Sequence, residues 1–449
     1  MTQTSGYLDA VRERVLVFDG AMGTQIQALG LSAADYGGNA LDGCPEILAV
    51  SRPDVIREIH RAYLAAGADV LETDTFTGTR LKLDDYQLGA RTHEINLAAA
   101  RLARAAADEF GTPARPRFVA GSMGPSGMLP SSDDPSLSNI TYQQLAELYR
   151  EQAAALIEGG VDLLLIETSQ DILEVRAAIT GIRRAFAEVG RTLPIQAQVT
   201  LDTSGRMLLG TDIAAASTIL YALGVDIAGL NCSTGPEHMR EPVRYLTESL
   251  PLPISTIPNA GLPLNVGGKA VYPLEPEPLA EALASFVGEF GVNVVGGCCG
   301  TTPEHIKRVV ERLAALPPER LRRPQDRLRT FPAEARQRTN RLVASAVRAN
   351  GLVQDPAPLL VGERVNAQGS RKIKRALLAD DYDTLLEVAR EQVAGGAHVL
   401  DVQTALTERP DEADQMRRAV KKLEMGIEAP LVIDSTEAGV IQAALETYP

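Results

Sequence analysis

The sequence has 449 residues, and 45% of them are hydrophobic. A chain of this length exceeds what a single hydrophobic core normally supports, so we expect two domains. A net charge of -14 and an isoelectric point near 5.0 argue against nucleic acid or an anionic membrane as partners and favour action on small molecules. No segment carries the roughly 18 apolar residues of a membrane span, and the polar start lacks a signal-peptide core. Four cysteines are too few for a disulfide framework, which favours a reducing cytoplasm.

Short apolar runs that end in small or polar residues recur through the first three hundred positions. Helical patterns such as residues 54–67 and 141–160 lie between them, with apolar residues returning every three or four positions. Strand and helix repeated eight times predict a (β/α)8 barrel, in which functional residues follow the strands. The eight runs are RVLVFDG, ADVLETD, RFVAGSMG, VDLLLIETS, PIQAQVTLD, VDIAGLNCS, PISTIPNAG and VNVVGGCCG.

The sequence changes character after the helical pattern at 303–316, because prolines and arginines become frequent. We interpret residues 317–356 as a connector, partly helical from Pro332 to Ala349. Its arginines could bind a phosphate or an acidic partner, but we favour a solvated face. Three further strand-end motifs follow: PLLVGERVNAQGS, AHVLDVQTALTERP and APLVIDSTEAG. Three strands cannot close a barrel. We therefore expect a barrel over 1–316, the first part of a second, incomplete (β/α) barrel over 357–449, and a chain that is a fragment of a longer protein or an incomplete gene model.

Three cysteines follow strands of the predicted barrel. Cys232 ends the sixth run, and Cys298 and Cys299 end the eighth, so barrel geometry brings them to one mouth. Vicinal cysteines rarely bond to each other, whereas three thiolates suit zinc, and an open fourth position would hold a thiol substrate as its thiolate. The alternative is that the thiols are inert core residues. Cys44 lies in a loop away from any strand end, and we leave it out of the site.

Acidic residues stand at two other strand ends, Asp19 after the first run and Glu167 after the fourth. These carboxylates could receive the α-ammonium group of an amino acid, and neighbouring glycine N–H groups its carboxylate. Asp19 could instead cap the following helix, whereas Glu167 needs a partner if it is buried. An amino-acid thiol therefore fits this mouth. The other polar residues expected at the rim are Thr73, Asp74, Thr75, Ser122, Asn231 and Asn259.

The motifs FDGAMGTQIQ, ETDTF, GSMGP, IETSQD, GLNCS, PNAG and GGCCGTTPEHI resemble, in order and spacing, the homocysteine-binding barrel of the cobalamin-dependent methionine synthases and related homocysteine S-methyltransferases. The resemblance covers about residues 8–316. The motifs VGERVNAQGSRKIKRAL, LDVQTALTERPDEADQMR and IDSTE resemble the start of the pterin-binding barrel that follows in methionine synthases and handles methyltetrahydrofolate.

The resemblance implies that Cys232, Cys298 and Cys299 bind Zn2+ and that homocysteine supplies the fourth ligand. It also implies a role for each of several other residues. Those expected to hold homocysteine are Asp19, Gly20, Glu167 and Asn231, and those expected to hold the pterin ring are Asn366, Asp401 and Asp434. The chain departs from the family at two positions, because members usually read ETNTF where this sequence has Asp74, and many read DVN where it has Gln403.

The reaction implied by the resemblance is methyl transfer to the thiol of homocysteine, which gives methionine. The methyl group would come from 5-methyltetrahydrofolate through methylcobalamin, carried on a cobalamin-binding module outside this chain. One alternative is a homocysteine methyltransferase that takes a direct donor such as S-methylmethionine or a betaine, although such a single-barrel enzyme has no reason to carry the second series of motifs. A fusion with methylenetetrahydrofolate reductase fits those motifs less well. From a different class, the chain could be a zinc- or thiol-binding scaffold without catalysis.

Overall fold

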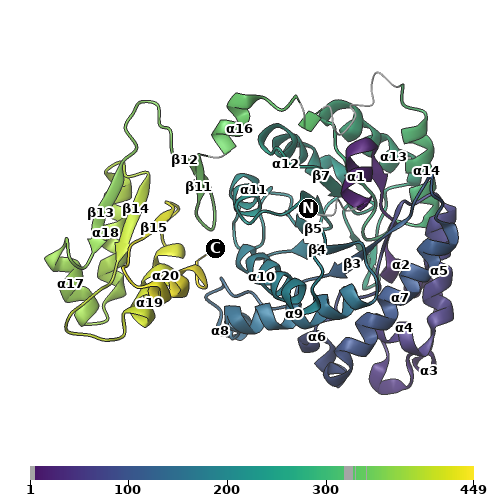
Figure 1. Ribbon diagram of the computed structural model, residues 1–449, viewed down its shortest axis with the longest axis horizontal. Coiled ribbons are helices and arrows are strands. Elements are labelled where there is room, and N and C mark those ends of the chain that lie inside the picture. The colour runs from purple at the N-terminus through teal and green to yellow at the C-terminus, as the bar shows by residue number, and fades with distance from the viewer. Residues whose placement is uncertain (1–5, 318–326, 329, 340, 449) are drawn as a thin grey trace.

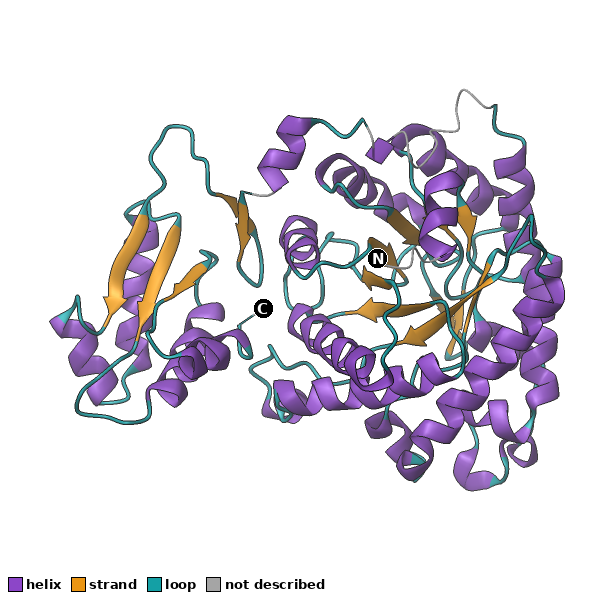
Figure 2. Ribbon diagram, viewed as in Figure 1, coloured by secondary structure: helices purple, strands orange, loops and turns teal. Residues whose placement is uncertain are grey.

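The computed structural model describes residues 6–317, 327–328, 330–339 and 341–448. Its larger part is an eight-stranded parallel sheet surrounded by helices, and its smaller part is a three-stranded parallel sheet with helices of its own (Figures 1 and 2). The predicted α/β architecture is therefore confirmed. Within the described residues, no helix is both long enough and apolar enough to cross a membrane.

The eight strands of the large sheet coincide with the eight predicted runs. Their spatial order is β1-β10-β7-β6-β5-β4-β3-β2, and a parallel bridge between Phe18 and Val70 joins the two ends of the sheet. This bridge closes the sheet into a barrel, which removes both open edges. The strands are β1 Leu16–Val17, β2 Val70–Glu72, β3 Phe118–Met123, β4 Leu163–Ser169, β5 Ile195–Val199, β6 Ile227–Asn231, β7 Ile254–Ile257 and β10 Val294–Val295.

The helices that connect these strands form the outer layer of the barrel. Shorter helices, turns and a hairpin are inserted at the mouth, the end where the strands finish. Thr141 and Gln144 form a capping box at the start of α9, and Gly190 ends α10 in a left-handed conformation with φ 73°. The helices are α2 Met22–Ala28, α3 Ala33–Tyr36, α4 Leu48–Ser51, α5 Pro53–Ala65, α6 Arg80–Asp84, α7 Thr92–Phe110, α8 Pro135–Ser138, α9 Tyr142–Glu158, α10 Ile172–Val189, α11 Ile213–Ala222, α12 Pro236–Ser249, α13 Pro276–Ser285 and α14 Pro303–Ala314. Short 3-10 turns occupy Asn39–Leu41, Pro45–Ile47 and Gly89–Arg91, a π-helical turn occupies Phe286–Phe290, and β8 Leu264–Val266 pairs with β9 Lys269–Val271 as a hairpin.

An N-terminal helix, α1 Gly6–Glu13, packs with the inward-facing residues of the barrel. Tyr7 is buried, its ring meets Phe118 edge-on, and its hydroxyl donates to Gln196 Oε1 at 2.7 Å. The helix thus supplies apolar surface inside the barrel and satisfies a buried amide there.

The connector is less helical than predicted. Its helix, α16, spans only Ala333–Thr339, and an antiparallel hairpin of β11 Leu342–Ala344 and β12 Ala349–Gly351 follows, so the prediction of helix as far as Ala349 is wrong. Ser345 Oγ accepts from the backbone N–H groups of Val347 and Arg348 and closes the hairpin turn. Parts of the connector, residues 318–326, 329 and 340, lie outside the described residues.

One arginine of the connector is buried, against the prediction of a solvated face. Arg327 donates to the carbonyl oxygens of Thr247 at 2.9 Å and Leu250 at 3.1 Å. These carbonyls lie at the end of α12, where a helix leaves backbone acceptors without partners. Burial lowers the pKa of Arg327 to about 10. Arg327 therefore satisfies a helix terminus and does not face solvent.

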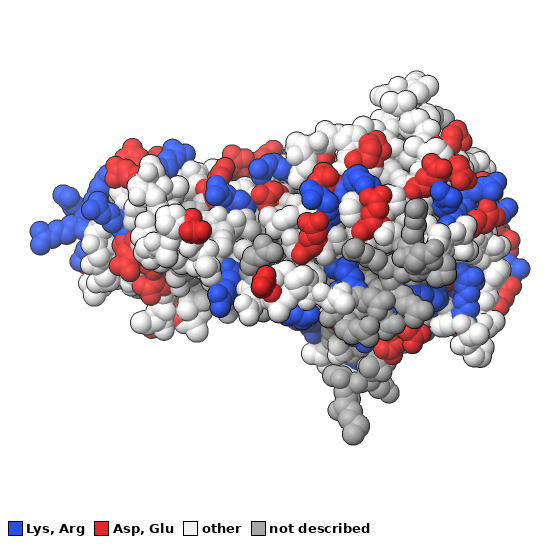
Figure 3. All heavy atoms as spheres, turned by 90° about the horizontal axis from the view of Figure 1, so that it is seen from above, with Lys and Arg blue, Asp and Glu red and all other residues white. Residues whose placement is uncertain are grey.

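The second part of the chain has the strand order β13-β14-β15, all parallel. It packs against the barrel through polar contacts: Arg176 donates to the carbonyl of Tyr448, and Lys421 donates to that of Pro130. Figure 3 shows acidic and basic side chains interspersed over one face, with basic side chains gathered at the end formed by α17. The elements are β13 Val361–Asn366, β14 Val399–Gln403, β15 Leu431–Ile433, α17 Arg371–Leu378, α18 Tyr382–Ala394, α19 Glu412–Glu424 and α20 Ala438–Leu445.

Candidate active site

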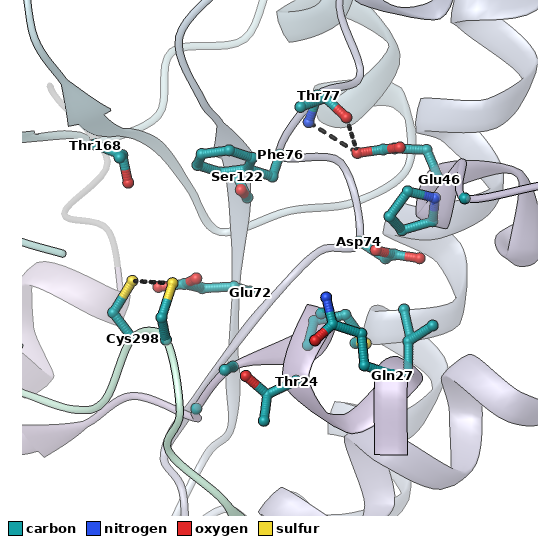
Figure 4. A pocket seen from close by; sticks show the side chains of 18 of the residues that line it. Thr24, Gln27, Glu46, Glu72, Asp74, Phe76, Thr77, Ser122, Thr168 and Cys298 are labelled. Atoms are coloured by element: carbon teal, nitrogen blue, oxygen red, sulfur yellow. Dashed lines mark hydrogen bonds between the residues drawn. The ribbon is translucent and has the colours of Figure 1, made fainter. Parts of the chain in front are cut away.

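A cavity of about 1270 Å³ lies at the mouth of the barrel, where the strands end. Its walls come from the ends of β1, β2, β3, β4, β6 and β10, from the segment between α2 and the turn Pro45–Ile47, and from the β8–β9 hairpin. Figure 4 shows Cys298 on one side of this cavity and Gln27, Glu46 and Asp74 on the other. Both sides open into one space, which is much larger than a single small amino acid needs.

The three predicted cysteines meet at the sulfur side. Cys299 Sγ lies 4.0 Å from Cys232 Sγ and 4.0 Å from Cys298 Sγ, and all three sulfurs fall within 4.8 Å of one another. They are the one group of three or more potential metal ligands among the described residues. The prediction that barrel geometry gathers them is therefore confirmed.

The backbone around the sulfurs is tightly constrained. Cys232 adopts a left-handed φ of 59°, which is uncommon for a residue with a side chain and marks a position held by its surroundings. The backbone N–H of Cys298 donates to the carbonyl of Pro258 at 2.8 Å, and that of Cys299 donates to Asn259 Oδ1 at 3.0 Å. Gly300 has a φ of 79° and leaves no room for a Cβ beside Tyr272. The loops thus fix the sulfur positions before any ligand binds.

The sulfur cluster favours one thiolate. The thiol of Cys232, followed by that of Cys298, donates toward Cys299 Sγ and lowers the pKa of Cys299 to about 3. The same contacts raise the pKa of Cys298 well above its usual value. These contacts therefore favour negative charge on Cys299 over Cys298.

The donor set fits zinc. In a tetrahedral site with Zn–S bonds near 2.3 Å, neighbouring sulfurs lie ~3.8 Å apart, and the two shorter separations here are 4.0 Å. Soft thiolate ligands favour Zn2+ over oxygen-preferring cations such as Mg2+ or Ca2+. Among the described residues no fourth His, Cys, Asp or Glu side chain joins the three sulfurs, which leaves one coordination position for a substrate atom, as catalytic zinc sites require.

Asp19 and Glu167 both lie in the cavity wall and are 3% and 4% exposed. Asp19 does not cap α2, since the residue at the cap position is Ala21, so the capping alternative is wrong. Both Asp19 carboxylate oxygens instead face the backbone N–H of Glu72, at 3.2 and 3.1 Å. Glu167 accepts from Ser122 Oγ at 2.5 Å and from Asn231 Nδ2 at 3.2 Å, which supplies the partners that its burial requires.

Burial raises the pKa of both carboxyl groups. Desolvation raises the pKa of Glu167 to about 7, against the opposing effect of its hydrogen bond from Ser122. Desolvation likewise raises the pKa of Asp19 well above its usual range, although the backbone N–H of Glu72 lowers it in part.

Two other predicted residues act on the shape of the site. Gly20 is required by packing, because a Cβ there would stand 2.6 Å from Thr301 Oγ1 and 2.9 Å from a ring carbon of Tyr63. Asn231 accepts from the backbone N–H of Thr168 at 2.7 Å while its Nδ2 faces Glu167. The end of β4 is therefore tied to the end of β6, directly before Cys232.

Asp74 lies apart from the sulfur side. In Figure 4 it is on the side of Glu46 and Gln27, and burial followed by the Glu46 carboxylate raises its pKa well above the usual range. The neighbouring Thr73 and Thr75 hydroxyls bond to each other at 2.6 Å and hold the loop after β2. The structure therefore does not bring Asp74 into the group around the sulfurs.

Glu72, which the sequence reasoning missed, also lines the sulfur side of the cavity. Figure 4 shows its carboxylate beside the cysteine sulfurs. Burial, followed by the Glu167 and Asp19 carboxylates, raises the pKa of Glu72 well above its usual range. The signal was present in the sequence, because Glu72 directly follows the apolar residues of the run ADVLETD, where the barrel places functional side chains.

The three predicted pterin-binding residues lie at neighbouring strand ends of the second sheet. Asn366 Nδ2 donates to Asp401 Oδ2 at 2.9 Å, and the Asp434 carboxylate, through its charge, is one cause of the raised pKa of Asp401, behind burial. Gln403 lies opposite Asn366 in the parallel pairing of β13 and β14, and its side-chain oxygen is buried without a hydrogen-bond partner in the described part of the chain. The sheet thus groups these polar residues at one edge.

Comparison with known proteins identifies the family of the first barrel. The family model "Homocysteine S-methyltransferase" matches residues 16–313, which is more than half of the chain. The chain belongs to the homocysteine S-methyltransferase family. A second model, "Pterin binding enzyme", matches residues 362–449.

Relatives in two mycobacteria cover nearly the whole chain. Methionine synthase of Mycobacterium tuberculosis is 43% identical and that of Mycobacterium leprae 42% identical, each over 439 residues and 98% of this chain. The matched region is 35% of either relative, so this homocysteine S-methyltransferase family member spans about a third of their length.

Solved structures of the homocysteine methyltransferase MmuM from Escherichia coli share the fold of the barrel. The metallated form gives a TM-score of 0.54 and covers 68% of this chain and 98% of that chain. The oxidized form gives 0.52 and covers 66% and 96%, and both are 24% identical.

Proposed function

We propose that the first barrel transfers a methyl group to the thiol of homocysteine and so forms methionine. The observation that carries this proposal is the group of three sulfurs at the mouth of a barrel of this family. Cys232, Cys298 and Cys299 would hold Zn2+. When bound, zinc supplies Lewis acidity that lowers the pKa of a thiol ligand, and a thiolate is the nucleophile that alkylation requires.

The residues around the sulfurs would orient the substrate. Asp19, Gly20, Glu167 and Asn231 are the proposed homocysteine contacts, with the carboxylates facing the substrate's ammonium group. Buried carboxyl groups without a basic partner favour a cationic ligand.

The second domain would bind 5-methyltetrahydrofolate through Asn366, Asp401 and Asp434. The match to the pterin binding enzyme model and the grouping of these three residues at one sheet edge support this role. The methyl group would then pass through methylcobalamin on a separate cobalamin-binding module. We place the reaction in the cytoplasm, since all four cysteines are free.

The test is methyl transfer from added methylcobalamin to L-homocysteine by the zinc-loaded chain, with methionine measured by mass spectrometry. We expect methionine that depends on zinc and on the chain. A parallel reaction with S-methylmethionine or a betaine in place of methylcobalamin separates the direct-donor alternative. No methionine with any donor, despite bound zinc, would indicate a scaffold without catalysis and contradict the proposal.

A further inference from the structure

The end of the barrel opposite the mouth repeats one hydrogen-bonding arrangement. A residue directly before a strand accepts, through a side-chain oxygen, from a backbone N–H of the neighbouring strand. The donor and acceptor pairs are Val17 and Asp69 at 3.2 Å, Val119 and Asp162 at 2.8 Å, Ile195 and Asp226 at 2.9 Å, and Ile254 and Asn293 at 2.9 Å. Because the neutral amide of Asn293 does the same as the three aspartates, this arrangement needs an acceptor atom but no negative charge and no basic partner.

Asp69 differs from the others in its basic neighbours. Three guanidinium groups lie against its carboxylate, whereas Asp162 is paired with one, that of Arg104 at 2.8 Å. The three contacts are those of Arg14 Nη1 with Oδ2 at 2.8 Å, Arg115 Nε with Oδ1 at 3.1 Å and Arg117 Nη1 with Oδ1 at 3.0 Å. The segments before β1 and before β3 supply these arginines, so closure of the barrel gathers them around the start of β2. Two of the three therefore exceed what the strand start requires.

The acceptor capacity of Asp69 is used up. A carboxylate offers about four lone-pair positions. Oδ1 receives Arg115 and Arg117, and Oδ2 receives Arg14 and the backbone N–H of Val17. Among the described residues, Arg14 Nη2 and Arg117 Nε are nevertheless buried without a hydrogen-bond partner. The cluster thus holds more N–H donors than the chain supplies with acceptors, which is unfavourable for buried groups.

The cluster also carries an excess of charge. Three guanidinium groups and one carboxylate leave two positive charges, and none of the three arginines pairs with a second acid within the described residues. Burial, followed by the charge of Arg115, lowers the pKa of Arg117, and Asp69 opposes this shift only in part. Such a concentration of positive charge stands out in a chain with a net charge of -14. An anion with two negative charges would balance it.

The geometry leaves the cluster open on one side. The side chains of Arg115 and Arg14 are 45% and 35% exposed, whereas those of Arg117 and Asp69 are 9% and 2% exposed. A backbone carbonyl holds the outermost arginine, because Arg115 Nη2 donates to Gly67 at 3.0 Å. Arg115 Nη1 makes no hydrogen bond in the described part of the chain. A buried base thus orients donors at the surface before a ligand arrives.

We propose that Arg14, Arg115 and Arg117 bind a phosphate dianion, either inorganic phosphate or the phosphate group of a monoester. Guanidinium groups match phosphate oxygens in geometry and form strong charge-assisted hydrogen bonds with them. A dianion equals the two uncompensated charges, whereas a carboxylate such as acetate would leave one. The site lies at the opposite end of the strands from the sulfurs and shares no residue with them, so it is independent of the proposed methyl transfer.

The experiment is titration calorimetry of the zinc-loaded 449-residue chain, freed of excess metal, with phosphate, sulfate and acetate at pH 8 and constant ionic strength. The proteins are the unaltered chain, Arg115→Gln and Arg12→Gln. Arg115→Gln removes the most exposed arginine of the cluster. Arg12→Gln is the matched control, since Arg12 is an exposed arginine whose charge acts on another strand-start aspartate, Asp226, and it already pairs with Asp9.

We expect phosphate and sulfate to bind the unaltered chain at least about tenfold more tightly than acetate. Arg115→Gln should weaken phosphate binding roughly ten- to a hundredfold through the loss of charge-assisted hydrogen bonds, while Arg12→Gln stays within about twofold of the unaltered chain. The proposal is overturned if the unaltered chain binds no phosphate, if acetate binds as tightly as phosphate, or if Arg115→Gln binds phosphate as tightly as Arg12→Gln does.

Thermal unfolding gives a second readout that separates binding from a purely structural role. A ligand that binds only the folded state raises the melting temperature. Phosphate, compared with acetate at equal ionic strength, should raise the melting temperature of the unaltered chain and of Arg12→Gln, and much less that of Arg115→Gln, even where Arg115→Gln starts from a lower value. Equal rises in all three proteins overturn the proposal.

A titration with glycerol 3-phosphate identifies the source of the ligand. Binding tighter than that of inorganic phosphate indicates a phosphate monoester, and weaker binding indicates the free anion. Both results support the site, provided that Arg115→Gln weakens the binding of the preferred compound. Glycerol 3-phosphate binding that Arg115→Gln leaves unchanged contradicts it.

Discussion

The mouth of the first barrel and the strand ends of the second domain carry the same kinds of residues in different surroundings. In the barrel, Asp19 and Glu167 are 3% and 4% exposed. In the second domain, Asp401 is only partly buried and Asp434 is exposed. The barrel sheet is closed by the Phe18–Val70 bridge, whereas the three strands β13 to β15 form an open sheet on which Val361 and Val432 are each 45% exposed.

The difference shows that closure of the sheet, more than residue type, sets the chemistry of strand-end acids. Desolvation raises the pKa of Glu167 to about 7 inside the barrel. Desolvation also raises the pKa of Asp401, but Asn366 donates a hydrogen bond to its carboxylate and so opposes the shift. This pair lies at an accessible edge of the second sheet. A ligand of the barrel site therefore enters a constrained, charged space, while the second site still exposes its polar groups to water.

The largest expected effect is on zinc. Cys298→Ser should abolish zinc retention and thiol alkylation, because it leaves two sulfurs where three are grouped within 4.8 Å. Methyltetrahydrofolate binding by the second domain should stay unchanged, since that site shares no residue with the sulfur cluster. Metal analysis by mass spectrometry and a folate titration measure the two effects, and unchanged zinc content would refute the assignment.

A pair of glycine substitutions compares packing in the two regions. Gly20→Ala should destabilise the protein by about 1–3 kcal/mol through overpacking, because its Cβ would stand 2.6 Å from Thr301 Oγ1. Gly439→Ala, at an exposed position in the first turn of α20 with nothing within 4 Å, should stabilise by about 0.5–1 kcal/mol. Chemical denaturation measures the free energy of unfolding of both variants. Equal changes in the two variants would contradict the prediction and would mean that the barrel mouth can relax.

The contact between the two regions should depend on pH through Glu424. Both of its carboxylate oxygens are buried, and burial raises its pKa to about 8, with Lys421 opposing the shift and Asp171 of the barrel adding to it. The folded state therefore binds a proton that the unfolded chain releases near pH 4.3, so stability falls as pH rises from about 4 to 8. Glu424→Gln should flatten this fall in denaturation measured at pH 5, 6.5 and 8. An unchanged slope would show that Glu424 is solvated.

The smallest expected effect on the site is that of Cys44→Ser. Cys44 is fully buried, and its sulfur lies 3.8 Å from Glu46 Oε2, outside the sulfur cluster. Zinc content should stay at the level of the unaltered chain, with a stability loss of about 1 kcal/mol. Loss of zinc in this variant would mean that the fourth thiol belongs to the site.

The barrel and the meeting of its sulfurs could be predicted because both follow from regular patterns. Apolar runs such as the one in β4 are buried on both faces of a parallel sheet, and this burial is what makes them continuous in sequence. The mouth position of Cys232 and Cys298 then follows from topology alone, since all strands of a barrel point the same way.

The remaining features depend on contacts that sequence periodicity does not encode. The β11–β12 hairpin has only three residues in each strand and lies in an arginine- and alanine-rich segment that favours helix, so its turn at Ser345 was masked by composition. Arg327 was assigned to solvent because its acceptors, such as the carbonyl of Thr247, are 80 positions away in sequence.

X-ray absorption at the zinc edge of the metal-loaded chain tests the central claim most directly. The account predicts three sulfur ligands at about 2.3 Å, contributed by Cys232, Cys298 and Cys299, and a fourth sulfur after L-homocysteine is added. Fewer than three protein sulfurs, or a sulfur count that homocysteine leaves unchanged, would contradict it.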